Sequence, residues 1–164
     1  MVRLLTCGAE DRWTFIRIDM YEWKLVRSVL EEGAPVKVAT PKDVVDYVEK
    51  YCMPKEDQWR EQAWVLAVDS ALNIKGHFQL SIGGTGSTVI DKKVIAKFAV
   101  DQLASGVVLV HNHPSGNSRP GTADINQTKD VRNGLKCLDI ELIDHIIIAD
   151  NEYYSFAGEE TTKR

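Results

Sequence analysis

Two histidines and an aspartate stand in a spacing that suits a catalytic metal ion. His111 and His113 lie two residues apart, directly after the apolar run at 107–110. That run is typical of a buried strand, and residues i and i+2 of a strand project from one face, so both imidazoles can approach one point. Asp124 follows in the first turn of an expected helix, where the helix dipole favours a carboxylate. Two imidazoles and one carboxylate leave a fourth position open, as in catalytic zinc sites.

The elements that would position these side chains alternate between helices and strands. Thr40 and Asp91 are suited to cap helices, and Gly121 or Thr122 opens another that runs to about Cys137. Helix and strand alternation predicts a three-layer α/β (mixed α+β) fold, with a central mixed sheet flanked by helices. The expected strands cover residues 63–68, 76–82, 107–111, 140–149 and 153–156, and a flexible loop covers 83–87.

The chain divides into three regions. Residues 1–38 form an N-terminal extension of unknown role, with a candidate strand at 13–18 and a candidate helix at 21–30. Residues 39–158 form the main domain, and residues 159–164 are expected to be a frayed tail.

Composition argues against several classes of protein. The formal net charge is −4 and the sequence pI about 5.6, whereas a protein that binds DNA through phosphates is usually basic. The three cysteines form no CxxC pair, so a disulfide framework is not expected and a reducing cytoplasm is the expected location. No run of 18 apolar residues predicts a membrane helix, and the N-terminus lacks a signal-peptide layout.

The string HNHPSGNSRPGTADINQT, residues 111–128, resembles the bacterial RadC family within the JAB/JAMM (MPN) metalloprotease superfamily. The superfamily pattern is an upstream Glu, then H-x-H-P, six residues, Ser, two residues and Asp. The resemblance covers roughly residues 40–158 and includes the segments at 60–61, 81–84 and 142–147. It implies the JAB/MPN (cytidine-deaminase-like) fold and a Zn²⁺ held by His111, His113 and Asp124.

The resemblance also assigns a general base. The family's catalytic Glu precedes the first core strand, which is the position of Glu61, and Glu56 is the alternative. Zinc lowers the pKa of bound water to about 7, and a nearby carboxylate can take the proton and pass it to the leaving amine.

Gly121 departs from the family pattern, because it occupies the position of the Ser thought to stabilise the oxyanion. Losing one such donor typically costs about 10²–10³ in rate. Thr122, Ser118 or a backbone N–H at the helix start could substitute; alternatively, activity has been reduced while the metal remains. His145 is expected to be structural or to orient a zinc ligand, and His77 to lie on the surface.

Two functions from different classes remain. One is a zinc metallopeptidase or isopeptidase acting on an unknown protein or peptide. The other is a non-catalytic metal-binding or DNA-repair-associated module, a label inherited from RadC; direct nucleic-acid binding is not favoured by the acidic balance. Zinc deaminases need H-x-E with P-C-x-x-C, metalloproteases of another class need HExxH, and both motifs are missing. No membrane association is expected, and the oligomeric state is left open.

Overall fold

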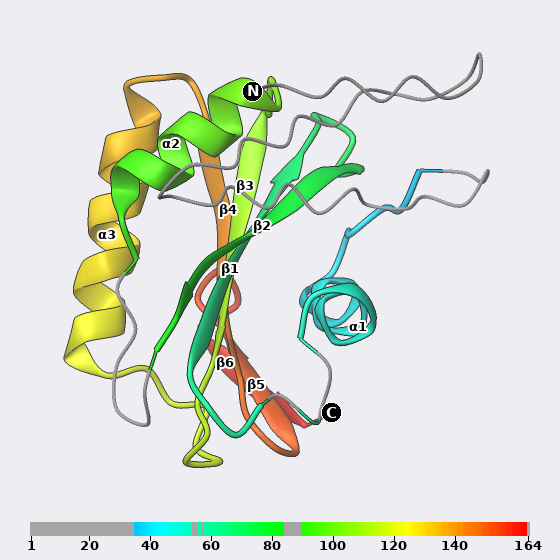
Figure 1. Ribbon diagram of the computed structural model, residues 1–164, viewed down its shortest axis with the longest axis vertical. Coiled ribbons are helices and arrows are strands. Elements are labelled where there is room, and N and C mark those ends of the chain that lie inside the picture. Colours follow the sequence, from blue (N-terminus) through cyan, green and yellow to red (C-terminus); the bar gives the residue numbers. More distant parts are fainter. Residues whose placement is uncertain (1–34, 54–55, 57, 84–89, 164) are drawn as a thin grey trace, which may run out of the picture.

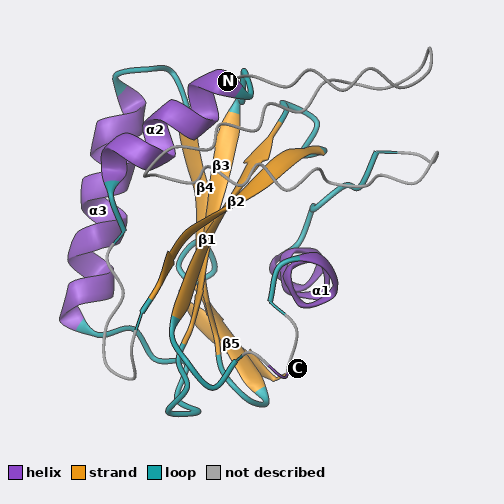
Figure 2. Ribbon diagram, in the orientation of Figure 1, coloured by secondary structure: helices purple, strands orange, loops and turns teal. Residues whose placement is uncertain are grey.

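The computed structural model describes residues 35–53, 56, 58–83 and 90–163. Within these residues, six strands form one mixed sheet in the order β2-β1-β3-β4-β5-β6, with three helices packed around it (Figures 1 and 2). In chain order the elements are α1 (Pro41–Tyr51), β1 (Gln62–Val68), β2 (Ile74–Ile82), α2 (Lys92–Asp101), β3 (Gly106–Asn112), α3 (Thr122–Lys136), β4 (Glu141–Ile148), β5 (Glu152–Ser155) and β6 (Glu160–Lys163).

The helices begin where the sequence indicates. The Thr40 hydroxyl accepts a hydrogen bond from the amide of Asp43, whose carboxylate accepts one in return from the Thr40 amide. This reciprocal capping box satisfies two amides that the helix cannot pair internally. Asp91 caps α2 by accepting from the amide of Lys93, and Gly121 stands at the N-cap of α3.

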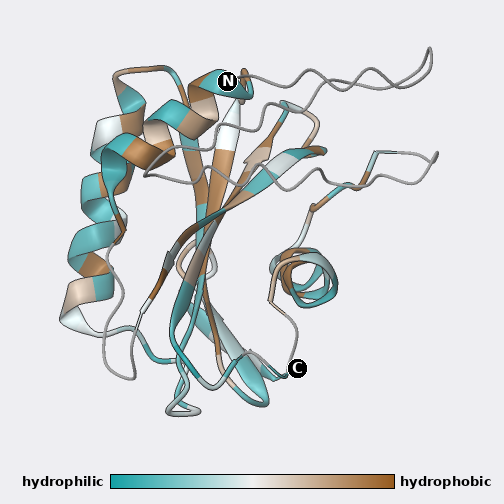
Figure 3. Cartoon of the chain, in the orientation of Figure 1, coloured by the Kyte–Doolittle hydropathy of each residue, from teal (hydrophilic) through white to brown (hydrophobic). Residues whose placement is uncertain are grey.

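Helices cover both faces of the sheet. Figure 1 shows α1 on one side and α2 with α3 on the other, which confirms the expected three layers. The central strands β1 and β3 are buried along their whole length, and Figure 3 shows apolar residues concentrated there. Alternation along β3 sends Val108 and Val110 into the core under α1, and Val107 and Leu109 into the core under α2 and α3.

The sheet register decides what surrounds the end of β3. Strand β3 runs parallel to β4, with α3 as the crossover, and antiparallel to β1. Ala63 pairs with His111, so continuing this register two residues beyond the ladder would bring Glu61 and His113 together on the same face. The start of β1 and the end of β3 therefore bring the expected base and ligands to one corner of the sheet.

Three regions differ from the sequence-based expectations. The tail at 159–164 is not frayed, because residues 160–163 pair with β5 as strand β6. His77 is buried rather than on the surface, because α1 covers that side of β2 and the Tyr47 hydroxyl bonds to its ring at 2.9 Å. Packing also begins before residue 39, since Val38 lies in the core.

Other expectations fall on residues outside the described ranges. These are the strand at 13–18, the helix at 21–30 and most of the loop at 83–87. Among the residues that the structure describes, no helix is both long and apolar enough to cross a membrane.

Candidate metal centre

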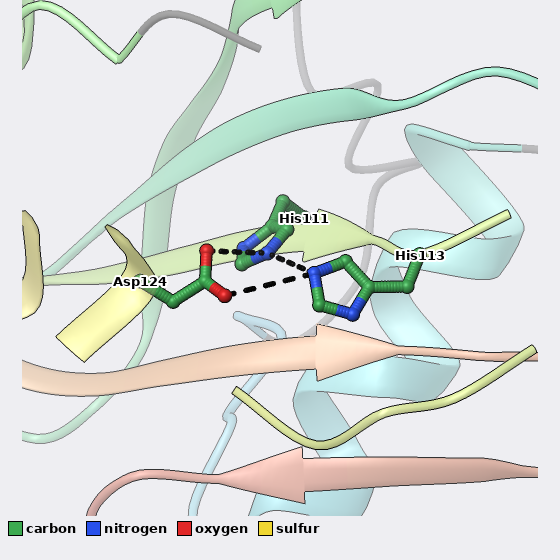
Figure 4. Close-up of side chains that lie close together, drawn as sticks. All are labelled: His111, His113 and Asp124. Atoms are coloured by element: carbon green, nitrogen blue, oxygen red, sulfur yellow. Dashed lines mark hydrogen bonds and ion pairs between the residues drawn. The ribbon is translucent and has the colours of Figure 1, made fainter. Parts of the chain in front are cut away.

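His111, His113 and Asp124 converge at the junction of β3 and α3 (Figure 4). The two Nε2 atoms are 3.0 Å apart. One Asp124 oxygen lies 3.3 Å from Nε2 of His111, and the other lies 3.8 Å from Nε2 of His113. Within the described chain, these three residues form the group of His, Cys, Asp and Glu side chains whose ligand atoms lie within 4.8 Å of one another. The structure thus brings together the three ligands expected from the spacing.

His113 presents its Nε2 to this cluster. Its Nδ1 lies 2.8 Å from the backbone carbonyl oxygen of Asn117. A carbonyl oxygen only accepts, so Nδ1 carries a hydrogen, and Nε2 is the atom that can offer a lone pair to a metal ion. The turn after Pro114 makes this contact, with Gly116 at a positive φ of 79° that glycine adopts readily.

Asp124 supplies the negative charge from the first turn of α3. Burial alone would raise the pKa of its carboxyl. A hydrogen bond and positive charge from His111, when a proton occupies its Nε2, and the hydrogen bond from the Gly121 amide outweigh burial and lower the pKa to about 2. The carboxylate is therefore ionised throughout the neutral range. Only 16% of this side chain is exposed, so its charge acts in a partly dry site.

The donor set fits a divalent metal. Two imidazole Nε2 atoms at 3.0 Å repel unless a cation or a proton lies between them, and the carboxylate adds one negative charge. Nitrogen and carboxylate donors with a further position open are the ligands of catalytic zinc, and they also suit Fe(II).

Glu61 lies beside the cluster rather than in it. It is half-buried and directly precedes β1. Its backbone carbonyl oxygen accepts a 2.8 Å hydrogen bond from the amide of Gly83, the residue after β2. The β1–β3 register, extended two residues beyond the Ala63–His111 pair, points Glu61 toward His113. A base for an attacking water belongs near the metal without being a ligand, so this placement is compatible with the expected role. Glu56, the alternative, is exposed in the preceding connector.

Asn112 holds the connector that carries Glu61. Its side-chain oxygen accepts from the Gln62 amide at 2.8 Å, and its nitrogen donates to the carbonyls of Gln58 and Arg60 at 3.0 Å each. Asn112 is only 2% exposed, so these bonds replace contacts with water. The residue between the two histidines therefore clamps the start of β1 against the end of β3.

The residues expected to replace the family Ser lie in different places. The Ser118 hydroxyl is completely buried and donates to Glu152 at 2.7 Å, so it fastens the loop to β5. Thr122 is the exposed first residue of α3. A Cβ at Gly121 would lie 3.4 Å from the nearer Asp124 oxygen, so a small side chain fits at this position.

Two polar side chains, His145 and Thr128, lie behind His111. The sequence indicates a role near the site only for His145. His145 contacts the far nitrogen of His111, and Thr128 contacts His145. Burial lowers the pKa of His145 well below its usual value, so its ring is neutral. His145 was expected near a ligand; Thr128 was not, although it lies one helical turn after Asp124 and hence on the same face of α3.

Comparison with known proteins gives a consistent result. The family model described as the RadC-like JAB domain matches residues 38–161. A UPF0758 protein of Flavobacterium johnsoniae is 37% identical over 99 residues, which are 60% of this chain and 43% of that protein. A UPF0758 protein of Thermotoga maritima is 34% identical over 164 residues, covering 97% of this chain and 74% of the relative. The chain spans about half the length of most of the relatives it matches.

Proposed function

Because the chain belongs to the RadC-like JAB domain family, we propose that it is a zinc-dependent hydrolase of peptide or isopeptide bonds. The observation that carries this proposal is the convergence of two imidazole Nε2 atoms and the Asp124 carboxylate in a partly exposed corner of the sheet. The resemblance to JAB/JAMM metalloproteases favours zinc over Fe(II). His111, His113 and Asp124 would hold the ion.

The residues of the chain divide the chemistry between them. A zinc ion held there would polarise the scissile carbonyl and make water acidic enough to be deprotonated near neutral pH. Glu61 takes a proton as the water oxygen attacks the carbonyl carbon. It then delivers that proton to the amide nitrogen as the C–N bond breaks, so a carboxylic acid and an amine are released, and the acid then gives its proton to the amine or to water.

Gly121 predicts slow turnover. The helix start offers backbone amides to an oxyanion, but the Gly121 amide is already used by Asp124. Without a side-chain hydroxyl at this position, the rate is expected to be about 10²–10³ below that of a site with one more donor.

The test compares the wild-type protein with Glu61→Gln, both loaded with zinc, on quenched peptide and isopeptide libraries. General-base catalysis contributes about 10²–10⁴-fold, so Glu61→Gln should lose that much turnover while keeping its zinc. A Glu61→Gln variant that hydrolyses as fast as the wild type would refute the role of Glu61.

Gly121 also supports a second candidate function, a metal-bearing interaction module of the RadC DNA-repair type that cleaves nothing. If the zinc-loaded wild type hydrolyses no amide, this function replaces the first. Fluorescence anisotropy with duplex and single-stranded DNA then tests whether nucleic acid is the partner, with equal binding expected for wild type and Glu61→Gln.

A further inference from the structure

Three buried polar side chains from three elements form a row behind the candidate metal centre. His111 is the second-last residue of β3, His145 lies in β4 and Thr128 lies in α3. Nδ1 of His111 is 2.8 Å from Nε2 of His145, and Nδ1 of His145 is 2.6 Å from the Thr128 hydroxyl oxygen. None of the three side chains belonging to this row is more than 3% exposed. Water therefore does not compete for these bonds.

The direction of every hydrogen bond in the row follows from its far end. The Thr128 hydroxyl lies 2.6 Å from the backbone carbonyl oxygen of Asp124, which can only accept, so the single hydroxyl hydrogen points there. Thr128 must then accept from His145, whose Nδ1 carries the hydrogen. His145 is 0% exposed and its ring nitrogens contact an imidazole and a hydroxyl, so a second ring proton would be a buried charge without a carboxylate at either nitrogen; the ring therefore carries one hydrogen, on Nδ1, and keeps a lone pair on Nε2.

The same logic reaches the metal site. His145 accepts at Nε2, so the hydrogen of His111 is on Nδ1 and the lone pair of His111 is on Nε2, the atom that faces His113 and Asp124. The ring of His145 is itself fixed by parallel stacking on Phe156, with centroids 4.9 Å apart and an interplanar angle of 8°. The row also joins two ligands, because it begins at the backbone of Asp124 and ends on His111.

We propose that Thr128 and His145 are positioning residues that set the tautomer of His111 and so prepare its Nε2 to bind a metal ion. This inference rests on the metal site of the proposed function. Without the Thr128 hydroxyl, the His145 ring loses its acceptor and can carry its hydrogen on Nε2 instead. His111 must then accept at Nδ1, which moves its own hydrogen to Nε2 and blocks the ligand atom.

The test uses Thr128→Val, which removes the hydroxyl at nearly constant volume, with Thr128→Ser as the variant that restores it. Loss of a group that orients a ligand typically lowers metal affinity about 10–100-fold. Competition with a chromophoric chelator should show that loss for Thr128→Val and near wild-type zinc affinity for Thr128→Ser. Wild-type affinity in Thr128→Val would overturn the proposal.

A pair of buried histidines separates positioning from general stability. His145→Phe should lose zinc affinity, whereas His77→Phe, which changes a histidine 2% exposed on the opposite face, should keep it. Equal losses of zinc affinity in both variants would mean that disturbed packing alone explains the effect, and would overturn the assignment.

The tautomer can also be measured without metal. Long-range ¹H–¹⁵N correlation spectra of the metal-free wild type should show the hydrogen of His111 on Nδ1, and the same spectra of Thr128→Val should show it displaced. A hydrogen on Nε2 alone in the wild type would refute the row of bonds. If the wild type binds no zinc, the proposed function fails, yet these spectra still decide the tautomer.

Discussion

Replacing Asn112 with alanine should destabilise the fold by about 3 kcal/mol. The side chain makes three neutral hydrogen bonds of 2.8–3.0 Å to the backbone, and each contributes about 1 kcal/mol. Asn112 is 2% exposed and Gln62 is 3% exposed, so water does not readily replace the lost partner of the Gln62 amide. The connector before β1 would be released, and Glu61 with it.

Urea denaturation followed by tryptophan fluorescence measures this loss, because Trp59 and Trp64 flank the clamped segment. Asn133→Ala, at an exposed position of α3, is the matched control and should change stability by less than about 0.5 kcal/mol. Amide exchange at Gln62 should accelerate in Asn112→Ala, and turnover should fall with zinc retained. A loss below about 1 kcal/mol with unchanged exchange at Gln62 would refute the clamp.

Two further predictions concern Gly121 and His77. Gly121→Ser should raise kcat by about 10²–10³ if a missing oxyanion donor limits the rate. Gly134→Ser, a control in open space on the same helix, should leave kcat unchanged. Steady-state assays that show no gain in kcat for zinc-loaded Gly121→Ser would exclude a missing oxyanion donor as the cause of slow turnover. Burial lowers the pKa of His77 in the folded protein. As pH falls below about 6.5, the unfolded chain therefore binds a proton at His77 more readily than the folded protein does, and the free energy of unfolding decreases. Urea titrations at several pH values should therefore give His77→Phe a pH slope smaller by up to about 1.4 kcal/mol per unit than the wild type, and equal slopes would contradict this assignment.

Local signals were enough for much of the fold. The caps at Thr40 and Asp91 act through residues two or three positions away, so the sequence shows both partners at once. The apolar run before His111 likewise predicts a buried strand, and the i, i+2 spacing predicts that the two histidines share a face. These inferences need only the period of the local backbone.

Contacts between distant segments could not be predicted in the same way. His145 reaches His111 across 34 residues, because the parallel register of β3 and β4 pairs it with Leu109 and makes His111 its diagonal neighbour. Ser118 was a candidate oxyanion donor from its position in the loop, but its hydroxyl donates to Glu152 of β5. Residues 160–163 of the tail form a strand because they pair with β5, and the composition of the tail alone does not indicate this pairing.

The most direct test of the account is the metal content of the chain. Elemental mass spectrometry on protein purified without added metal should find close to one zinc per wild-type chain, little zinc in His113→Ala, and wild-type zinc in His77→Phe. No metal in the wild type even after zinc is supplied, or iron in place of zinc, would contradict the proposed zinc hydrolase centre at His111, His113 and Asp124.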